Sequence, residues 1–149
     1  MVMPSQFRRV TVAALFLLAC QCSSDSGTEP AVQCASGSAD EALFNQYFDR
    51  MALVDRASGL PGQADPQLGE RYPSNAVLEL RMDAKAPVSV RACVEVRDGS
   101  GTVARDVSHS AATGSSGVEL GSFAANASGY VVRVTVNTTL VKNFPFVTQ

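Results

Sequence analysis

The sequence predicts a mainly β fold, an antiparallel β-sandwich with one N-terminal amphipathic helix packed on it. Two patterns support this prediction. From residue 76 onwards, apolar and polar residues alternate with a period of two, which is typical of strands that bury one face. Before residue 58, apolar residues recur at steps of three and four, which is typical of an amphipathic helix. Strands of parallel β-α-β units would be continuously apolar, so we expect antiparallel sheets.

Residues 1–19 have the layout of a secretory signal peptide. Arg8 and Arg9 form a positive start, and residues 10–19 are apolar except for Thr11. This run is too short for a bilayer-spanning helix, which needs about 20 apolar residues, but it suits the hydrophobic region of a signal peptide. The alternative is a buried helix of the fold, and no amphipathic pattern supports it.

The apolar run ends in Leu17-Leu18-Ala19-Cys20. These residues resemble the lipobox of bacterial lipoproteins, with an aliphatic residue at −3, a small residue at −1 and cysteine at +1. The resemblance implies cleavage before Cys20, a diacylglyceryl group on its thiol and an acyl chain such as palmitate on the new amine. Two or more chains anchor a protein stably in a membrane. Gln21 replaces the aspartate that often marks retention at the inner membrane, so we expect a lipid anchor in the outer membrane.

Residues 20–33 are expected to form a flexible tether. They include a polar run, Ser23 to Pro30, which has too little apolar surface to offset the entropy lost on ordering. Such a segment holds a folded domain away from the membrane.

Residues 34–57 are predicted to contain the amphipathic helix, from Ser38 to Arg56. Ser38 and Glu41 have the spacing of a capping box, and Gly59 is a plausible stop. We expect the apolar stripe to pack on the domain rather than to dock a partner. The stripe consists of Leu43, Phe44, Tyr47, Phe48, Met51 and Val54.

Residues 58–75 are rich in proline and glycine and are predicted to be a loop. The β-sandwich is expected over residues 76–149, in one domain with the helix. Its predicted strands are 78–83, 88–97, 102–108, 118–123, 130–137 and 140–148, with a loop over 109–117. Pro145 suggests that the last strand lies at a sheet edge.

Two segments carry a further resemblance. "PVSVRACVEVRDGSGTV" and "SGYVVRVTV" resemble bacterial immunoglobulin-like or fibronectin-type domains, and the resemblance covers roughly residues 74–148. Gly129-Tyr130 is similar to the aromatic corner position of such domains. The resemblance implies an immunoglobulin-like β-sandwich.

Four cysteines are present. If Cys20 carries lipid, three remain, and three pairings are possible. A compartment outside the cytoplasm favours a disulfide. We expect Cys34–Cys93, because Cys93 falls on the polar side of its strand and Cys34 lies just before the helix. Cys22 would then be free or paired with another molecule, and a metal site at Cys20 and Cys22 is not expected, because zinc ligands usually have CxxC-type spacing.

No catalytic motif is recognisable, and we expect neither enzyme activity nor a cofactor nor a bound metal. His109 is interpreted as an exposed loop residue, because no acidic residue follows it closely. Glu79 and Glu95 are two carboxylates that a sandwich can bring together, although solvated charges are the simpler interpretation. The net charge of −2 and only two lysines argue against nucleic acid as a partner.

These observations favour a membrane-anchored envelope protein that acts as a non-enzymatic interaction or assembly module, in a secretion, adhesion or motility machine. The expected partners are the membrane, through lipid on Cys20, and another envelope protein. The strand with Pro145 and the 58–75 loop are the two alternative docking places for that protein. The alternative is a module that binds glycan or peptidoglycan. The sequence contains no tryptophan for an aromatic sugar platform.

Overall fold

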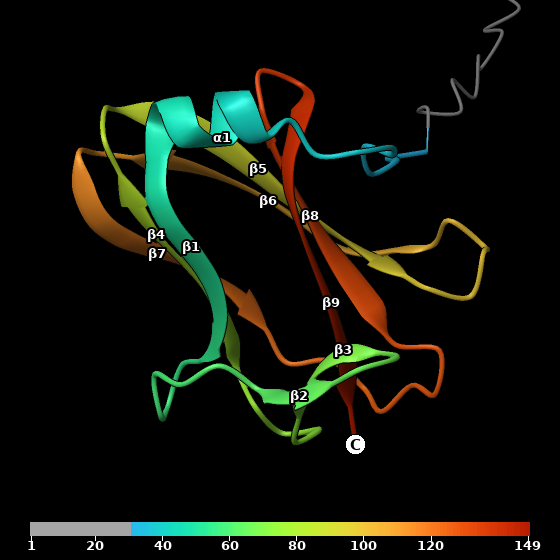
Figure 1. Ribbon diagram of the computed structural model, residues 1–149. Coiled ribbons are helices and arrows are strands. Elements are labelled where there is room, and N and C mark those ends of the chain that lie inside the picture. Colours follow the sequence, from blue (N-terminus) through green and yellow to red (C-terminus); the bar gives the residue numbers. More distant parts are fainter. Residues whose placement is uncertain (1–30) are drawn as a thin grey trace, which may run out of the picture. The chain divides into compact units, whose positions relative to one another are not determined.

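The structure is a computed structural model that describes residues 31–149 (Figure 1). The predicted signal peptide, the lipobox and most of the tether lie outside the described residues. The described part is mainly β, as the sequence predicts. Its elements are α1 (Glu41–Tyr47), β1 (Phe48–Asp55), β2 (Gln63–Asp65), β3 (Gly69–Tyr72), β4 (Leu78–Ala84), β5 (Val88–Val96), β6 (Val103–Ala111), β7 (Gly114–Gly121), β8 (Tyr130–Val136) and β9 (Thr139–Thr148).

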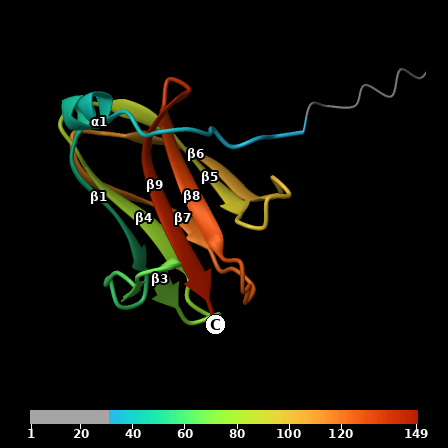
Figure 2. The same cartoon turned by 45° about the vertical axis from the view of Figure 1, so that its right-hand side comes forward.

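The strands form two sheets. One has three strands in the order β1-β4-β7, and the other has six in the order β2-β3-β9-β8-β5-β6. Neighbouring strands are antiparallel except for β3 and β9, which are parallel. In Figures 1 and 2, β1, β4 and β7 lie on one side of the domain, and β5, β6, β8 and β9 lie on the other.

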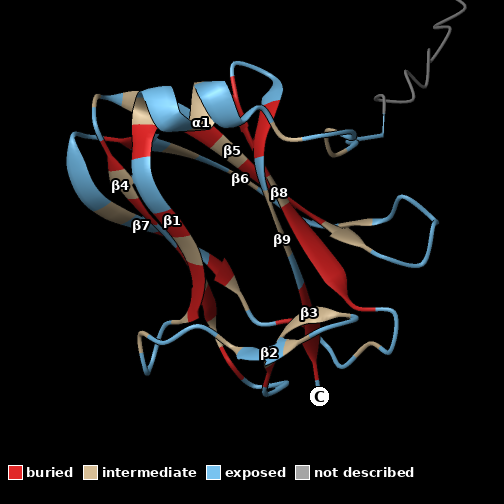
Figure 3. Ribbon diagram, in the orientation of Figure 1, coloured by how far each residue is buried: buried red, intermediate tan, exposed pale blue. Residues whose placement is uncertain are grey.

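Side chains from both sheets meet in one hydrophobic core. Because side chains alternate between the faces of a strand, β4 buries every second residue in this core. Figure 3 shows that buried residues occur in both sheets. Burying one such side chain contributes about 1.5–3 kcal/mol relative to leaving it exposed. The large side chains with almost no exposed surface include Leu53, Leu78, Leu80 and Leu120 from the smaller sheet and Val94, Val132, Val134 and Phe146 from the larger one.

The prediction of one helix from Ser38 to Arg56 is wrong in its second half. Helix α1 covers only Glu41–Tyr47, and the chain continues directly as β1. The N-cap is Asp40 rather than Ser38, and its carboxylate accepts a hydrogen bond from the backbone N–H of Leu43 at 2.9 Å. Only the first turns of the apolar stripe are therefore helical.

A β-bulge explains why the spacing of apolar residues predicted a helix where the structure has strand β1. The register with β4 shifts between Phe48 and Arg50. The extra residue of a bulge interrupts the alternation of side chains, so that Phe48, Met51 and Leu53 all reach the core. Their uneven spacing imitates a helical stripe, although the pairing with β4 makes the segment a strand.

Two predicted loops are also corrected. Residues 58–75 contain the short hairpin β2–β3, and β3 is held in place by its parallel pairing with β9. Residues 109–117 are mostly strand, because β6 runs to Ala111 and β7 begins at Gly114. These segments consist largely of small and polar residues, which do not show the alternation of a half-buried strand. Their pairing depends on distant parts of the chain.

Pro145 does not mark a free edge, because β9 lies between β3 and β8. Its carbonyl oxygen faces Gly69 in β3. The nitrogen and the carbonyl oxygen of one strand residue point to the same side, so the missing N–H of Pro145 also faces away from β8. The ladder between β8 and β9 is therefore unaffected at Pro145, which pairs with Val131.

Candidate functional site

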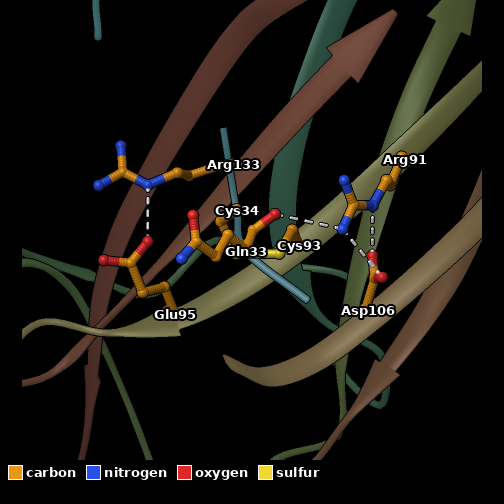
Figure 4. The surroundings of a disulfide bond; sticks show 7 residues. All are labelled: Gln33, Cys34, Arg91, Cys93, Glu95, Asp106 and Arg133. Atoms are coloured by element: carbon orange, nitrogen blue, oxygen red, sulfur yellow. Dashed lines mark hydrogen bonds and ion pairs between the residues drawn. A yellow bond between two sulfur atoms is a disulfide. The ribbon is translucent and has the colours of Figure 1, made fainter. Parts of the chain in front are cut away.

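The predicted disulfide is present: Cys34 and Cys93 are joined with a Cα–Cα distance of 5.4 Å (Figure 4). Cys93 lies in the middle of β5, opposite Asp106 of β6 and Arg133 of β8. Its neighbours Ala92 and Val94 face the core, so Cys93 faces the outer side of the six-stranded sheet, as its place on the polar side of the strand predicts. The disulfide therefore ties the N-terminal segment to a central strand.

Residues 33–40, here named the strap, cross the outer face of this sheet. At one end, Arg91 Nη2 donates to the carbonyl oxygen of Gln33 at 3.3 Å, beside the disulfide. At the other end, the backbone N–H of Asp40 donates to the carbonyl oxygen of Leu140 at 2.8 Å. Since β8 lies between β5 and β9 in the sheet, the strap passes across β8. Thr135, on the outer face of β8, is accordingly buried.

Two ion pairs flank the disulfide on this face (Figure 4). Arg91 makes a bidentate ion pair with Asp106, with Nε–Oδ1 at 2.8 Å and Nη2–Oδ2 at 3.0 Å. The contact with Asp106 raises the pKa of Arg91 above its ordinary value. Arg133 Nε lies 3.2 Å from Glu95 Oε2. The charges on this face are thus paired next to the disulfide and the strap.

The outer face of the three-stranded sheet carries a second group of charges, here named the charged face. Alternation puts these residues outward, because the intervening residues of β4, such as Leu80 and Met82, fill the core. The charged face consists of Arg50, Arg56, Glu79, Arg81, Asp83 and Glu119, three cations and three anions.

All six charges take part in ion pairs. Arg50 Nη2 lies 2.9 Å from Asp83 Oδ2, and Arg81 Nε lies 2.8 Å from Glu79 Oε1. Arg56 contacts the third acid, Glu119, and also lies 3.8 Å from Glu79. Exposed pairs of this kind contribute about 0–1 kcal/mol each to stability. The charged face therefore matters more for what it presents to solvent than for holding the fold.

A hollow of about 550 Å³ lies within this face. Ala52 and Val54 contribute apolar surface to it, the segment Gly59 to Pro61 borders it, and charged-face residues including Arg50 and Arg81 line it. Leu60, between Gly59 and Pro61, is 64% exposed and lines a neighbouring pocket instead. Apolar surface is thus surrounded by charges of both signs.

Two local features shape the charges around the hollow. The hydroxyl of Ser115 donates to Asp83, and together with Arg50 it holds the pKa of that carboxyl below its ordinary value. Asp83 therefore stays ionised at neutral pH. Gly117 lies under the side chain of Glu79, whose carboxylate occupies the space that a Cβ would take. The glycine thus lets Glu79 lie flat between Arg56 and Arg81.

His109 is not a loop residue, as the sequence predicted, but belongs to β6. Its Nε2 lies 3.3 Å from Ser116 Oγ, and the ring is half-buried. Glu79 and Glu95 are not brought together: they lie on different sheets, and each is paired with arginine. Among residues 31–149, no group of three or more His, Cys, Asp or Glu side chains is arranged to hold a metal ion.

The charged face was not recognised as a unit from the sequence. Its clearest signal was the alternation of charge in β4, where Glu79, Arg81 and Asp83 occupy every second position. The partners Arg50, Arg56 and Glu119 come from other parts of the chain, and the spacing of these residues does not reveal that they meet.

Fold and site together define a mainly β, disulfide-bonded domain with one strapped face and one charged face. No family model matches the sequence, and neither curated proteins nor solved structures gave a match. Within the part of the chain that the structure describes, no helix is long and apolar enough to cross a membrane.

Proposed function

We propose that this chain is an outer-membrane lipoprotein whose β-sandwich domain is a non-enzymatic interaction or assembly module. The anchor in this proposal is lipid on Cys20, supported by the leader and by the residues Leu17 to Cys20. The disulfide suits such a location, because disulfides persist in oxidising compartments outside the cytoplasm.

The shared core and the strand order support a sandwich of the immunoglobulin or fibronectin type. In such domains strands A, B and E lie in one sheet and strands C, F and G in the other. Here β1, β4 and β7 occupy the first set, and β5, β8 and β9 the second. Tyr130 begins β8, and its hydroxyl donates to the carbonyl oxygen of Ala124 at 2.8 Å, as in a tyrosine corner.

The partner in this proposal is another envelope protein, and it docks on the charged face. The observation that carries this step is the hollow of about 550 Å³ between paired charges, which Ala52 and Val54 also line. Charged groups around an apolar centre give an interface its specificity and its rate of association. The loop before β2, which borders the hollow, is part of the 58–75 segment that the sequence suggested for docking.

A charge reversal tests this proposal. In cells, Arg81→Glu should reduce crosslinking of the lipoprotein to its partner by about tenfold, since a loss of roughly 1.4 kcal/mol corresponds to that factor. Lys142→Glu is the matched control: it makes the same change of charge on β9 of the other sheet and should leave crosslinking unchanged. Membrane crosslinking followed by mass spectrometry provides the measurement. Equal crosslinking in the wild type and in Arg81→Glu would remove the charged face from the proposal.

No observation on residues 31–149 favours the alternative of glycan or peptidoglycan binding. None of their aromatic side chains is exposed, whereas sugar-binding surfaces often use aromatic platforms. Titration of the protein with peptidoglycan fragments, followed by NMR, addresses this alternative directly. Chemical-shift changes around Arg50 and Arg81 would favour it over protein docking.

A further inference from the structure

We propose that the Cys34–Cys93 disulfide is a mechanical clamp that passes tension from the membrane anchor into β5 and keeps it away from α1 and β1. This inference rests on the proposed function, because the tension arises between the lipid on Cys20 and a partner bound to the domain. A pull on the N-terminal side of Cys34 can enter the fold by two routes.

The first route follows the backbone and is the only one when the disulfide is absent. Tension on Cys34 then runs through the strap into α1, a helix of seven residues with none buried. It continues into β1, which pairs with a single strand, β4. A pull on the end of such a strand breaks its hydrogen bonds one after another.

This backbone route would also disturb the charged face. Strand β1 carries Arg50, and Ala52 and Val54 line the hollow. Peeling β1 from β4 would separate Arg50 from Asp83, which face each other across the two strands. The anchor would then deform the surface that the partner is proposed to hold.

The second route passes through the disulfide. Cys93 lies in the middle of β5, and β5 pairs with β6 on one side and with β8 on the other. Ala92 and Val94, next to Cys93, are at most 1% exposed and are packed in the core. A pull at this point loads two ladders and the core packing together, so many contacts must fail at once.

Covalent geometry decides between the two routes. The chain from Cys34 to Cys93 contains the strap, α1 and strands β1 to β4, and the disulfide closes it into a loop with a sequence separation of 59. Tension that enters at Cys34 leaves this loop slack and continues from Cys93. The strap, α1, β1 and Arg50 therefore stay in place while the anchor is pulled.

Single-molecule pulling of the full-length chain tests the clamp. The chain carries coupling tags at both ends, and Cys20→Ser and Cys22→Ser leave only the two clamp cysteines. The test variant adds Cys34→Ser and Cys93→Ser. We expect this variant to show an early, low-force step that releases a contour length of about 7 nm, because roughly 20 residues of strap, α1 and β1 become extended at about 3.5 Å each. The oxidised chain should lack this step.

Reduction of the folded chain is the second measurement, and it covers the case in which the serine variant does not fold. The same molecule is pulled before and after addition of a dithiol reductant, which converts the disulfide to two thiols and is itself oxidised. The early step should appear only after reduction. An early step in the oxidised chain, or its absence from the reduced chain, would overturn the clamp.

The outcome is independent of the lipid anchor, since these chains lack Cys20. Failure of the clamp would leave the lipoprotein proposal standing. Failure of the anchor would be seen instead in membrane fractionation of the Cys20→Ser variant.

Discussion

Tyr72 is the residue that protects one edge of the three-stranded sheet. Its ring is 2% exposed, and the one proton of its hydroxyl is shared between the carbonyl oxygen of Leu53, at 2.9 Å, and the carboxylate of Glu70. Leu53 lies in β1, which has no strand on its far side. An unpaired carbonyl at a sheet edge invites pairing with another chain. The tyrosine therefore satisfies a backbone group that the sheet itself leaves open.

Removing the hydroxyl of Tyr72 should destabilise the folded domain. We expect Tyr72→Phe to lower the free energy of unfolding by about 1–3 kcal/mol, because a buried acceptor loses its partner. Tyr130→Phe is the matched control. Its acceptor, the carbonyl oxygen of Ala124, also receives a hydrogen bond from Thr148 Oγ1 at 2.7 Å, so the loss should be smaller. Urea unfolding of both variants measures the difference, and equal losses would contradict this explanation.

The same tyrosine predicts a dependence of stability on pH. Burial, and next the hydrogen bond with Glu70, raise the pKa of Tyr72 far above its ordinary value. In the unfolded chain the phenol ionises at about pH 10. Its contribution is therefore constant below pH 10 and is lost as the pH rises further, because only the unfolded state releases the proton. The wild type should lose stability more steeply than Tyr72→Phe above about pH 10, and parallel curves would exclude this role.

Gly69 allows β3 to lie against β9. It has a φ of +95°, and a Cβ at this position would overlap the backbone carbonyl of Pro145. Gly99 has a similar φ of +81° but nothing within 4 Å of a Cβ. Both alanine variants bear the backbone strain, of order 1–3 kcal/mol, and only Gly69→Ala adds the clash. Thermal melting should show a clearly larger loss for Gly69→Ala, and similar losses would mean that β3 can move aside.

At the scale of the elements, the strap and β5 act as one unit through the disulfide. Closing a loop of this length restricts the unfolded chain and stabilises the domain by about 4 kcal/mol in the chain-entropy model. We expect Cys34→Ser combined with Cys93→Ser to lower the free energy of unfolding by this order. Cys22→Ser is the control and should have no effect. Denaturant unfolding with and without reductant measures the loss, and a reduced chain as stable as the oxidised one would contradict it.

The helix and the strand that follows it show how elements depend on their neighbours. The segment from Phe44 to Val54 has the spacing of one apolar helical stripe. Its first part becomes helix because Asp40 caps the backbone N–H of Leu43. Its second part becomes strand because β4 offers a complete ladder of partners, and the bulge after Phe48 keeps the apolar residues turned inward. Local spacing alone does not distinguish these outcomes.

At the scale of the whole molecule, the proposed lipid on Cys20 decides where the domain resides. We expect Cys20→Ser to move the protein from the membrane fraction to the soluble fraction, because the acyl chains provide the attachment. Cys22→Ser, two residues away, is the control and should remain in the membrane fraction. Immunoblots of fractionated cells measure the distribution. Retention of Cys20→Ser in the membrane fraction would refute the lipobox interpretation.

Several strands were predictable because each can be recognised within its own segment. Strand β4 alternates apolar and polar residues throughout, β5 and β8 do so over most of their length, and β9 follows a turn at Asn137 and Thr138. The hairpin β2–β3 was not predictable, because proline and glycine dominate its segment and β3 is fixed by pairing with residues more than 70 positions away.

The site was predictable to a similar extent. The pairing of Cys34 with Cys93 was predicted from the number of cysteines left after Cys20 and from the place of Cys93 on the polar side of its strand. The charged face did not, because its six residues come from three strands and the segment after β1. Their grouping depends on the register that places Arg50 opposite Asp83 and Glu79 opposite Glu119.

The sequence by itself determined the period of several strands, the inward-facing residues of those strands and which cysteine faces outward. These properties are local, since they depend on the chemistry of neighbouring residues. Only the tertiary structure decided that β1 is a strand, that β9 is covered by β3, and that three arginines and three acids share one surface. Such features depend on pairing between distant segments, where backbone hydrogen bonds and shared burial outweigh local preference.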